Sequence, residues 1–227
     1  MKKLTGKYVV EQLKRFWKFI WYDDSLLSYV MNIVVAFIFI KFLLFPGLGL
    51  VLGNDYPVVA IVSGSMEHKT SGYQVCGTPV GGKVERLSQE AWWSYCGDYY
   101  EDEFNLTLEN FKEFEYKNGL NIGDVMVLYG KDPKKIGVGE VIVFVPQNRA
   151  WFENNGPVIH RVVKKWEGED GKNYFQTKGD HNEISIPYPA LGETNISEDD
   201  VIGKPIARVP WVGYAKILLN KVVGMIL

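Results

Sequence analysis

A long apolar run, residues 26–45, is the strongest hydrophobic pattern of the chain, and it contains one charge, Lys41. As a helix, about 20 residues measure roughly 30 Å, the thickness of a bilayer's hydrocarbon core. A buried core helix rarely runs so long without charge, and a cleaved signal peptide has a shorter core followed by a small-residue site. We therefore expect a retained transmembrane anchor over residues 25–47, ended by Pro46 and the glycines after it.

Both ends of the chain carry patterns typical of membrane contact. Residues 1–24 interleave bulky apolar and basic side chains, which predicts an amphipathic helix on the inner membrane surface. Positive charge before a span stays cytoplasmic, so the rest of the chain is expected on the extracytoplasmic side. Residues 211–227 are apolar apart from one polar stripe. They predict a membrane-interacting helix, with a second span as the alternative.

The middle of the chain predicts a mainly β domain formed by residues 48–66 and 122–210. Short apolar segments between Gly, Asp and Asn turns are typical of strands. The segments are 57–62, 125–129, 140–145, 158–166, 174–178 and 201–209.

Residues 67–121 interrupt this pattern and are interpreted as an inserted acidic subdomain of helical and irregular structure, packed but peripheral. Helical spacing is evident only within 107–116. The segment holds both cysteines, Cys76 and Cys96. On the oxidising side of a membrane a disulfide is favoured over two free thiols, which remain the alternative.

Composition narrows the possible functions. The net charge of −2 argues against a nucleic-acid partner. A mean hydropathy of −0.08 fits a mostly soluble domain with one apolar segment. His68 and His181 are potential metal ligands, but the sequence has no His-Glu-x-x-His motif or Cys/His cluster. We therefore expect no metal and no other cofactor.

Three short runs carry candidate chemistry. Ser65 lies in Val-Ser-Gly-Ser-Met-Glu, about 20 residues after the apolar run. A serine nucleophile needs a base and a group that orients the base. His160 lies in an apolar strand, with Arg161 expected on that strand's opposite face, and Asp180 follows in Lys-Gly-Asp-His-Asn. Imidazole titrates near neutral pH, which suits proton transfer.

These runs resemble the type I signal peptidases of the archaeal and endoplasmic-reticulum branch, in which histidine replaces the bacterial lysine. The resemblance covers residues 57–66, 124–145, 157–166 and 174–188 together with the anchor. It implies a signal-peptidase-like β-rich catalytic domain with Ser65 as nucleophile, His160 as general base and Asp180 as the orienting acid. Lysines 164 and 165 do not occupy the base position, so a Ser–Lys dyad is not expected.

The resemblance also implies further site residues. Ser63 and the backbone N–H of Ser65 are candidates for the oxyanion hole, and Glu183 for a second acid. Val62, Ile142 and Phe144 are candidates for the walls of the substrate pockets. The chain departs from the family pattern at His68, where proline is common, and at His181, where asparagine is common.

We expect a serine endopeptidase that removes signal peptides from exported preproteins. It would be single-pass in the cell membrane or endoplasmic-reticulum membrane, with its catalytic domain extracytoplasmic. Its partners would be signal peptides, membrane lipid and, as a candidate, the protein-export channel. One alternative is a self-cleaving peptidase of the SOS-repressor type, against which the anchor and the lack of a DNA-binding segment count. The other is a non-catalytic membrane-tethered subunit or partner-binding protein on the same fold.

Overall fold

The computed structural model describes residues 6–70, 74–214 and 217–218. The chain divides into two compact units, Met1–Val51 and Leu52–Leu227, which are considered separately.

The first unit is helical and has a hydrogen-bonded corner. Helix α1 (Gly6–Tyr22) precedes helix α2 (Leu26–Phe39). The hydroxyl of Ser28 donates to the carbonyl of Phe19 at 2.7 Å, and the amide of Asn32 donates to the carbonyl of Ile20 at 2.9 Å. These carbonyls lie in the last turn of α1, where a helix leaves acceptors without partners. Side chains of α2 therefore fix the end of α1.

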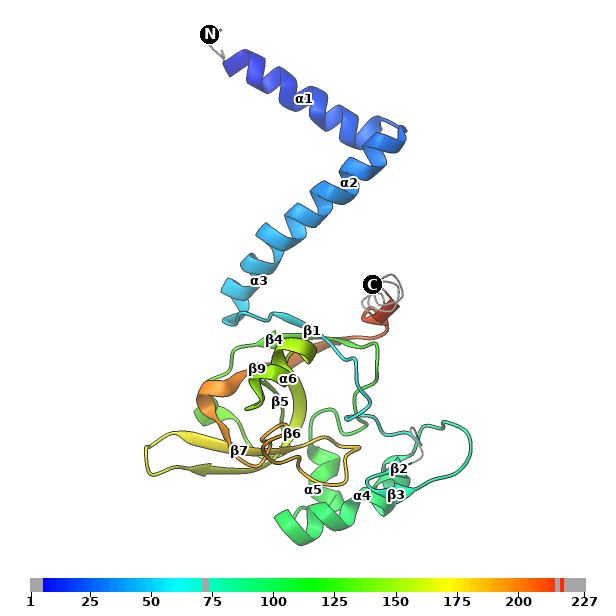
Figure 1. The fold of residues 1–227 in the computed structure, drawn as a ribbon, viewed down its shortest axis with the longest axis vertical. Coiled ribbons are helices and arrows are strands. Elements are labelled where there is room, and N and C mark those ends of the chain that lie inside the picture. Colours follow the sequence, from blue (N-terminus) through cyan, green and yellow to red (C-terminus); the bar gives the residue numbers. More distant parts are fainter. Residues whose placement is uncertain (1–5, 71–73, 215–216, 219–227) are drawn as a thin grey trace. The chain divides into compact units, whose positions relative to one another are not determined.

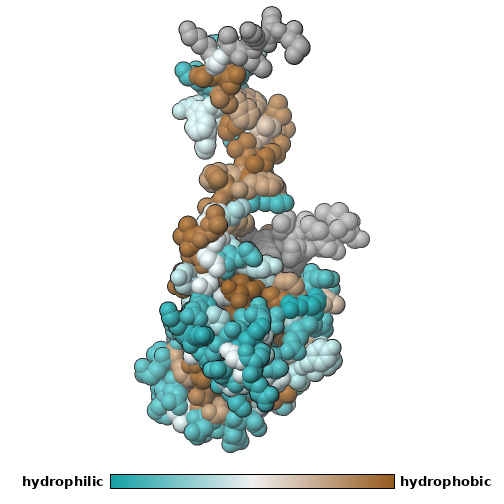
Figure 2. Space-filling model, turned by 90° about the vertical axis from the view of Figure 1, so that its left-hand side faces the viewer, coloured by the Kyte–Doolittle hydropathy of each residue, from teal (hydrophilic) through white to brown (hydrophobic). Residues whose placement is uncertain are grey.

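The apolar helix is longer than the sequence predicts. A π-helical turn η1 (Ile40–Leu44) connects α2 to α3 (Phe45–Leu52), giving one candidate membrane span of 27 residues, about 40 Å long. Its visible face is mostly hydrophobic (Figure 2). The predicted end at Pro46 is wrong, because the π turn before Pro46 widens the helix where proline has no N–H to donate. The helix ends instead before Gly53, whose φ is +67°.

The second unit contains a seven-stranded antiparallel sheet, so the predicted mainly β fold with an N-terminal apolar helix is confirmed (Figure 1). The strand order is β1-β4-β9-β5-β6-β7-β8. The strands are β1 (Val58–Ala60), β4 (Val125–Tyr129), β5 (Val141–Phe144), β6 (Val158–Glu167), β7 (Asn173–Lys178), β8 (Ile196–Ser197) and β9 (Val201–Val209). Register shifts in the β4–β9, β5–β9 and β6–β7 pairs bend the sheet.

All six predicted strands are confirmed, but several short elements carry no clear pattern. These are the two-residue β8, helix α6 (Arg149–Asn155) and the 3₁₀ turns η2 (Pro133–Lys135) and η3 (Glu198–Asp200). Helix α6 starts because the Asn148 side chain accepts from the N–H of Trp151.

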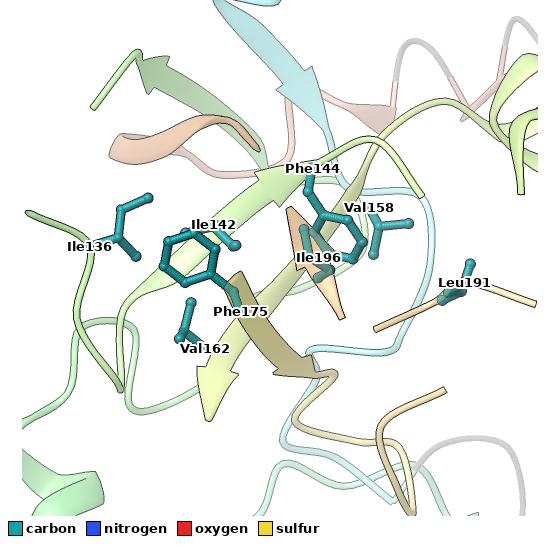
Figure 3. Packing of buried hydrophobic residues seen from close by; sticks show 8 residues of the cluster. All are labelled: Ile136, Ile142, Phe144, Val158, Val162, Phe175, Leu191 and Ile196. Atoms are coloured by element: carbon teal, nitrogen blue, oxygen red, sulfur yellow. The ribbon is translucent and has the colours of Figure 1, made fainter. Parts of the chain in front are cut away.

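Hydrophobic cores lie against both faces of the central strand β5. Its four residues are all buried, which explains the unbroken apolar run. One core holds Ile136, Ile142, Phe144, Val158, Val162, Phe175, Leu191 and Ile196 (Figure 3). The other holds Ile61, Met66, Leu120, Met126, Leu128, Val141 and Val143, and it anchors the turn on either side of Ser65.

The inserted segment forms a hairpin and two helices. The hairpin pairs β2 (Gln74–Val75) with β3 (Thr78–Pro79). Helix α5 (Leu108–Glu113) is confirmed within the predicted region, and helix α4 (Gln89–Phe104) is additional. Residues Trp92, Trp93, Cys96 and Tyr100 have helical spacing, but Asp98 and the acidic residues 101–103 obscured this pattern.

The insert is part of the packed body of the second unit, so the expectation that it is peripheral is wrong. Trp92, Tyr100 and Phe111 are fully buried, and their cluster includes Val163 of β6. At the other end of the domain, most of the helix expected over residues 211–227 lies outside the described residues, and that expectation stays a prediction.

Candidate active site

Ser65 lies in a tight turn a few residues after the end of β1. The N–H of Glu67 donates to the carbonyl of Gly64 at 3.0 Å, which closes the turn. The N–H of His181 donates to the carbonyl of Ser65 at 2.8 Å. Because Ile61 and Met66 are buried in the core on either side, the backbone holds the half-buried Ser65 side chain in a fixed place.

His160 contacts Ser65 directly. Its Nε2 lies 2.9 Å from the Ser65 Oγ, and the residue is 2% exposed. His160 is in β6, opposite Ile142 of β5. The sequence therefore identified two residues that the fold brings together from positions 95 residues apart.

Glu193, which the sequence reasoning missed, occupies the other side of the imidazole. Its Oε1 lies 2.5 Å from the Nδ1 of His160 and accepts from the hydroxyl of Thr177 at 2.9 Å. Its Oε2 accepts from the N–H of Ile186 at 2.8 Å. Because a carboxylate only accepts, Nδ1 carries the ring proton and Nε2 presents its lone pair to Ser65. Serine hydrolases hold nucleophile, base and acid in this order.

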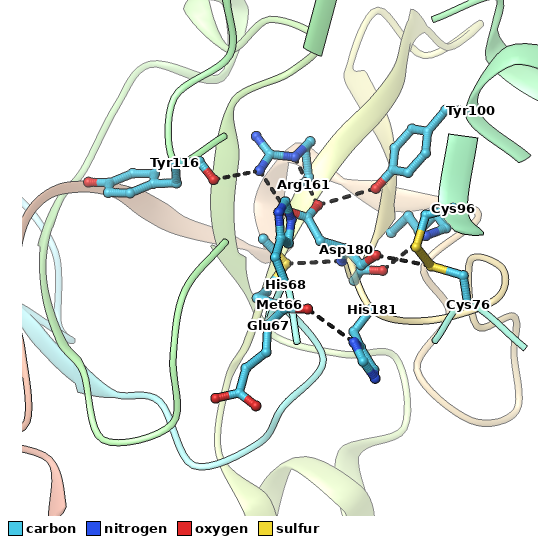
Figure 4. Close-up of polar contacts among 12 residues, drawn as sticks. Met66, Glu67, His68, Cys76, Cys96, Tyr100, Tyr116, Arg161, Asp180 and His181 are labelled. Carbon is cyan, nitrogen blue, oxygen red and sulfur yellow. Dashed lines mark hydrogen bonds and ion pairs between the residues drawn. A yellow bond between two sulfur atoms is a disulfide. The ribbon is translucent and has the colours of Figure 1, made fainter. Parts of the chain in front are cut away.

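Asp180, the predicted orienting acid, is not brought to His160. Its carboxylate instead accepts from Arg161 at 2.9 and 2.7 Å, from His68 at 3.1 Å and from Tyr100 at 3.2 Å (Figure 4). Neighbouring residues of a strand point to opposite faces. His160 therefore points toward Ser65, while Arg161 points the other way, as predicted, and Asp180 lies on the Arg161 side.

The contacts of Asp180 form a buried charge network beneath the site. Burial would raise the pKa of Asp180, but the charge of Arg161 and hydrogen bonds from His68 and Arg161 hold it well below its usual range. Burial lowers the pKa of His68, whose ring stacks on Trp92 with centroids 4.0 Å apart. Burial and the charge of Asp180 raise the pKa of Tyr100. The network joins the insert to the sheet.

Lys178 is a fully buried amine next to this network. Its Nζ lies 4.6 Å from the centre of the Tyr100 ring and donates to the carbonyl of Gly179 at 3.2 Å. Burial lowers the pKa of Lys178 to about 7, against the opposing charges of Asp180 and Glu193.

The remaining predicted residues divide into two groups. The Ser63 Oγ lies 3.2 Å from the Ser65 Oγ, so this candidate oxyanion donor is next to the candidate nucleophile. Val62 is half exposed and lines a cavity with Ser65 and His160. Ile142 and Phe144 do not line it: both are fully buried in the core, because β5 is covered on both faces.

Glu183, the candidate second acid, is also not brought to the imidazole. It is exposed and makes no hydrogen bond to His160 among the residues that the structure describes. Glu193 takes that place, ten positions later. In the sequence, Glu193 shows only as an isolated acid in the run Leu-Gly-Glu. Its approach to His160 depends on how the loop after β7 folds back, which the local sequence does not show.

A disulfide joins Cys76 to Cys96, with Cα atoms 5.3 Å apart. The N–H of Cys76 donates to the carbonyl of His181 at 3.2 Å. The N–H of His181 donates to the Ser65 carbonyl. His181 therefore links the disulfide-bonded β2–β3 hairpin to the turn that carries Ser65. The two other histidines also have partners: the ring nitrogens of His181 lie near the carbonyls of Glu67 and Gln74.

Fold and site together define a β-rich protein with a Ser–His–carboxylate array, preceded by an apolar helix long enough to span a membrane. No family model matches the chain. It is 34% identical over 101 residues to the signal peptidase complex catalytic subunit SEC11 of Metarhizium robertsii, covering 44% of this chain and 55% of that protein. It is 32% identical over 99 residues to the human signal peptidase complex catalytic subunit SEC11C, covering 43% and 49%.

The resemblance indicated by the motifs is thus confirmed: the chain has homologues among the signal peptidase catalytic subunits of the endoplasmic-reticulum type. The matched region spans about half the length of these relatives.

Proposed function

We propose that this chain is a membrane-bound serine endopeptidase that cleaves signal peptides from exported preproteins. The observation that carries the proposal is the continuous contact from the Ser65 Oγ to His160 and on to Glu193, at 2.9 and 2.5 Å. The names of the relatives support the same activity.

Each step of the proposed chemistry has a candidate residue. As the Ser65 Oγ attacks the scissile carbonyl carbon, His160 Nε2 takes its proton, and Glu193 stabilises the imidazolium through Nδ1–H. Collapse of the tetrahedral intermediate breaks the C–N bond, and His160 returns the proton to the leaving amine. Water then hydrolyses the acyl-enzyme with the same base. The Ser63 hydroxyl, whose oxygen lies 3.2 Å from the Ser65 Oγ, and the Ser65 N–H are the candidate donors to the oxyanion.

The cleft beside Ser65 suits the end of a signal peptide. A cavity of about 500 Å³ is walled mainly by apolar residues, among them Val62, Trp151 and Leu191. Strand β1 is at the edge of the sheet, so an extended peptide can add to its unpaired side. Shallow apolar walls accommodate the small side chains that precede a signal-peptide cut.

The membrane arrangement follows from the charges and the helix. The span Leu26–Leu52 would anchor the protein once, in the cell membrane or endoplasmic-reticulum membrane. The basic residues before it would remain cytoplasmic, which places the catalytic unit on the other side. Helix α1 would lie on the inner lipid surface, since its exposed Leu13, Trp17 and Trp21 share one face. Companion subunits and the export channel are candidate partners.

Cleavage by the purified full chain in detergent tests this proposal. A model preprotein should be cut once, and the new N-terminus, read by sequencing, should follow a small residue. A non-catalytic tethered subunit would bind the preprotein without cutting it, and its Ser65 would not react with a serine-directed probe. Intact preprotein and an unlabelled Ser65 would therefore overturn the proposal.

A further inference from the structure

A second cavity adjoins the one that holds Ser65 and His160. It measures about 610 Å³, and its lining includes Gly64, which directly precedes the nucleophile. The two cavities share Asn182 and Ile186 as lining residues. The two cavities therefore lie next to each other, with Gly64 lining one and Ser65 the other.

The two cavities differ in charge. The second cavity is lined by two carboxylates, Glu67 and Glu183. Glu67 is buried and neutralised, since its Oε1 accepts from Lys69 at 2.8 Å and from the N–H of Ile122 at 3.0 Å. Glu183 is exposed and has no hydrogen bond or ion pair among the described residues. The second cavity thus presents one uncompensated negative charge.

The insert supplies one wall of this cavity. Gln74 and Gly77, from the β2–β3 hairpin, are lining residues. A Cβ on Gly77 would meet the Glu183 Cδ at 2.6 Å, and Gly77 has a φ of +78°, so only glycine allows the carboxylate to lie there. The disulfide and the bond from Cys76 to His181 hold the hairpin in place without substrate. The cavity is therefore pre-formed.

We propose that the second cavity binds the residues that follow the cut, and that Glu183 makes the enzyme favour basic over acidic side chains there. The inference rests on the proposed function. An extended substrate has to cross Ser65 with its scissile carbonyl. If the apolar cavity takes the small residues before the cut, the mature chain leaves through the polar one. On this account the insert determines specificity on the mature side.

Paired substrates test the charge preference. Two preproteins should differ only by Lys or Glu at the second residue after the cut, with a third carrying Gln. The full chain in detergent should show a kcat/KM about two- to fivefold higher for Lys than for Glu at low salt, the range of a single exposed charge pair. Added salt should reduce this ratio, because exposed charges are screened.

Variants then assign the preference to one side chain. In Glu183→Gln the Lys/Glu ratio should approach one, and in Glu183→Lys it should invert. Glu169→Gln is the matched control, since Glu169 is an exposed acid in the β6–β7 hairpin, and it should keep the wild-type ratio. An unchanged ratio in both Glu183 variants would overturn the inference. Cleavage of the Gln substrate by the wild-type chain tests the proposed function separately. If the wild-type chain does not cleave this substrate, the proposed endopeptidase function is refuted.

Discussion

Replacing Glu193 by glutamine should disable catalysis while leaving the fold intact. Both oxygens of Glu193 accept hydrogen bonds, from His160, Thr177 and Ile186. In the isosteric amide, the NH₂ group can donate to His160 Nδ1 and to the Thr177 hydroxyl, while the amide oxygen keeps the bond from Ile186. Each of the three partners keeps one hydrogen bond to residue 193, so the stability cost is small.

The same substitution puts the imidazole proton on the wrong nitrogen. With Nδ1 accepting from the amide, the ring proton moves to Nε2, which then cannot take the proton of Ser65. The corresponding change in a serine-protease triad lowers kcat about 10⁴-fold, and we expect a loss of about 10³–10⁴-fold here. Glu169→Gln, the same change at an exposed acid in the β6–β7 hairpin, should retain activity.

Asp180→Asn should instead lower the stability of the fold while folded molecules keep their turnover. It removes the charge that faces the fully buried Arg161, and breaking such a pair costs about 3–5 kcal/mol. For a domain of this size that is roughly 6–20 °C in Tm. Measuring kcat per folded molecule together with thermal melting separates the two roles. Near-normal kcat in Glu193→Gln, or a lost kcat with an unchanged Tm in Asp180→Asn, would refute the assignment of Glu193.

Three further predictions concern other parts of the site. Ser63→Ala should lower kcat about 10²–10³-fold with little change in KM if its hydroxyl donates to the oxyanion, and a wild-type kcat would exclude that role. Unfolded lysine titrates near 10.4 and burial lowers the pKa of Lys178 to about 7, so between these values the unfolded state binds more protons. The free energy of unfolding should then increase with pH by up to about 1.4 kcal/mol per pH unit. Denaturation series at pH 7 to 10 measure this increase, and Lys178→Met should remove it. Reducing the Cys76–Cys96 disulfide should increase proteolysis of the insert and lower activity, since the hairpin contacts the residue that holds Ser65; unchanged cleavage after verified reduction would contradict this.

The sequence predicts the parts of this fold that depend on local pattern. The strands, the apolar helix and the amphipathic α1 follow from the spacing of apolar residues, and the Ser65 and His160 runs stand out by composition. The extent of the apolar helix was not predictable in the same way. Pro46 normally signals a helix end, but a π turn absorbs it.

The errors arose where three-dimensional context decides the outcome. Asp180 and Glu193 are both buried acids after β7, and only the alternation of His160 and Arg161 across β6 determines which one reaches the imidazole. Ile142 and Phe144 look like groove residues in a strand with one open face, whereas β5 is covered on both faces. The role of the insert depends on contacts between the β2–β3 hairpin and the 179–182 turn. Such contacts between distant residues produce no periodic pattern in the sequence, so they could not be predicted from it.

The central claim is that Ser65 performs the attack with His160 as its base. The most direct test compares preprotein cleavage by the full chain in detergent with that of Ser65→Ala, with Ser94→Ala, an exposed serine of α4, as the matched control. We predict that Ser65→Ala remains folded by thermal melting and loses cleavage by a factor on the order of 10⁴ or more, while Ser94→Ala cleaves normally. Near-normal turnover by folded Ser65→Ala would contradict the account.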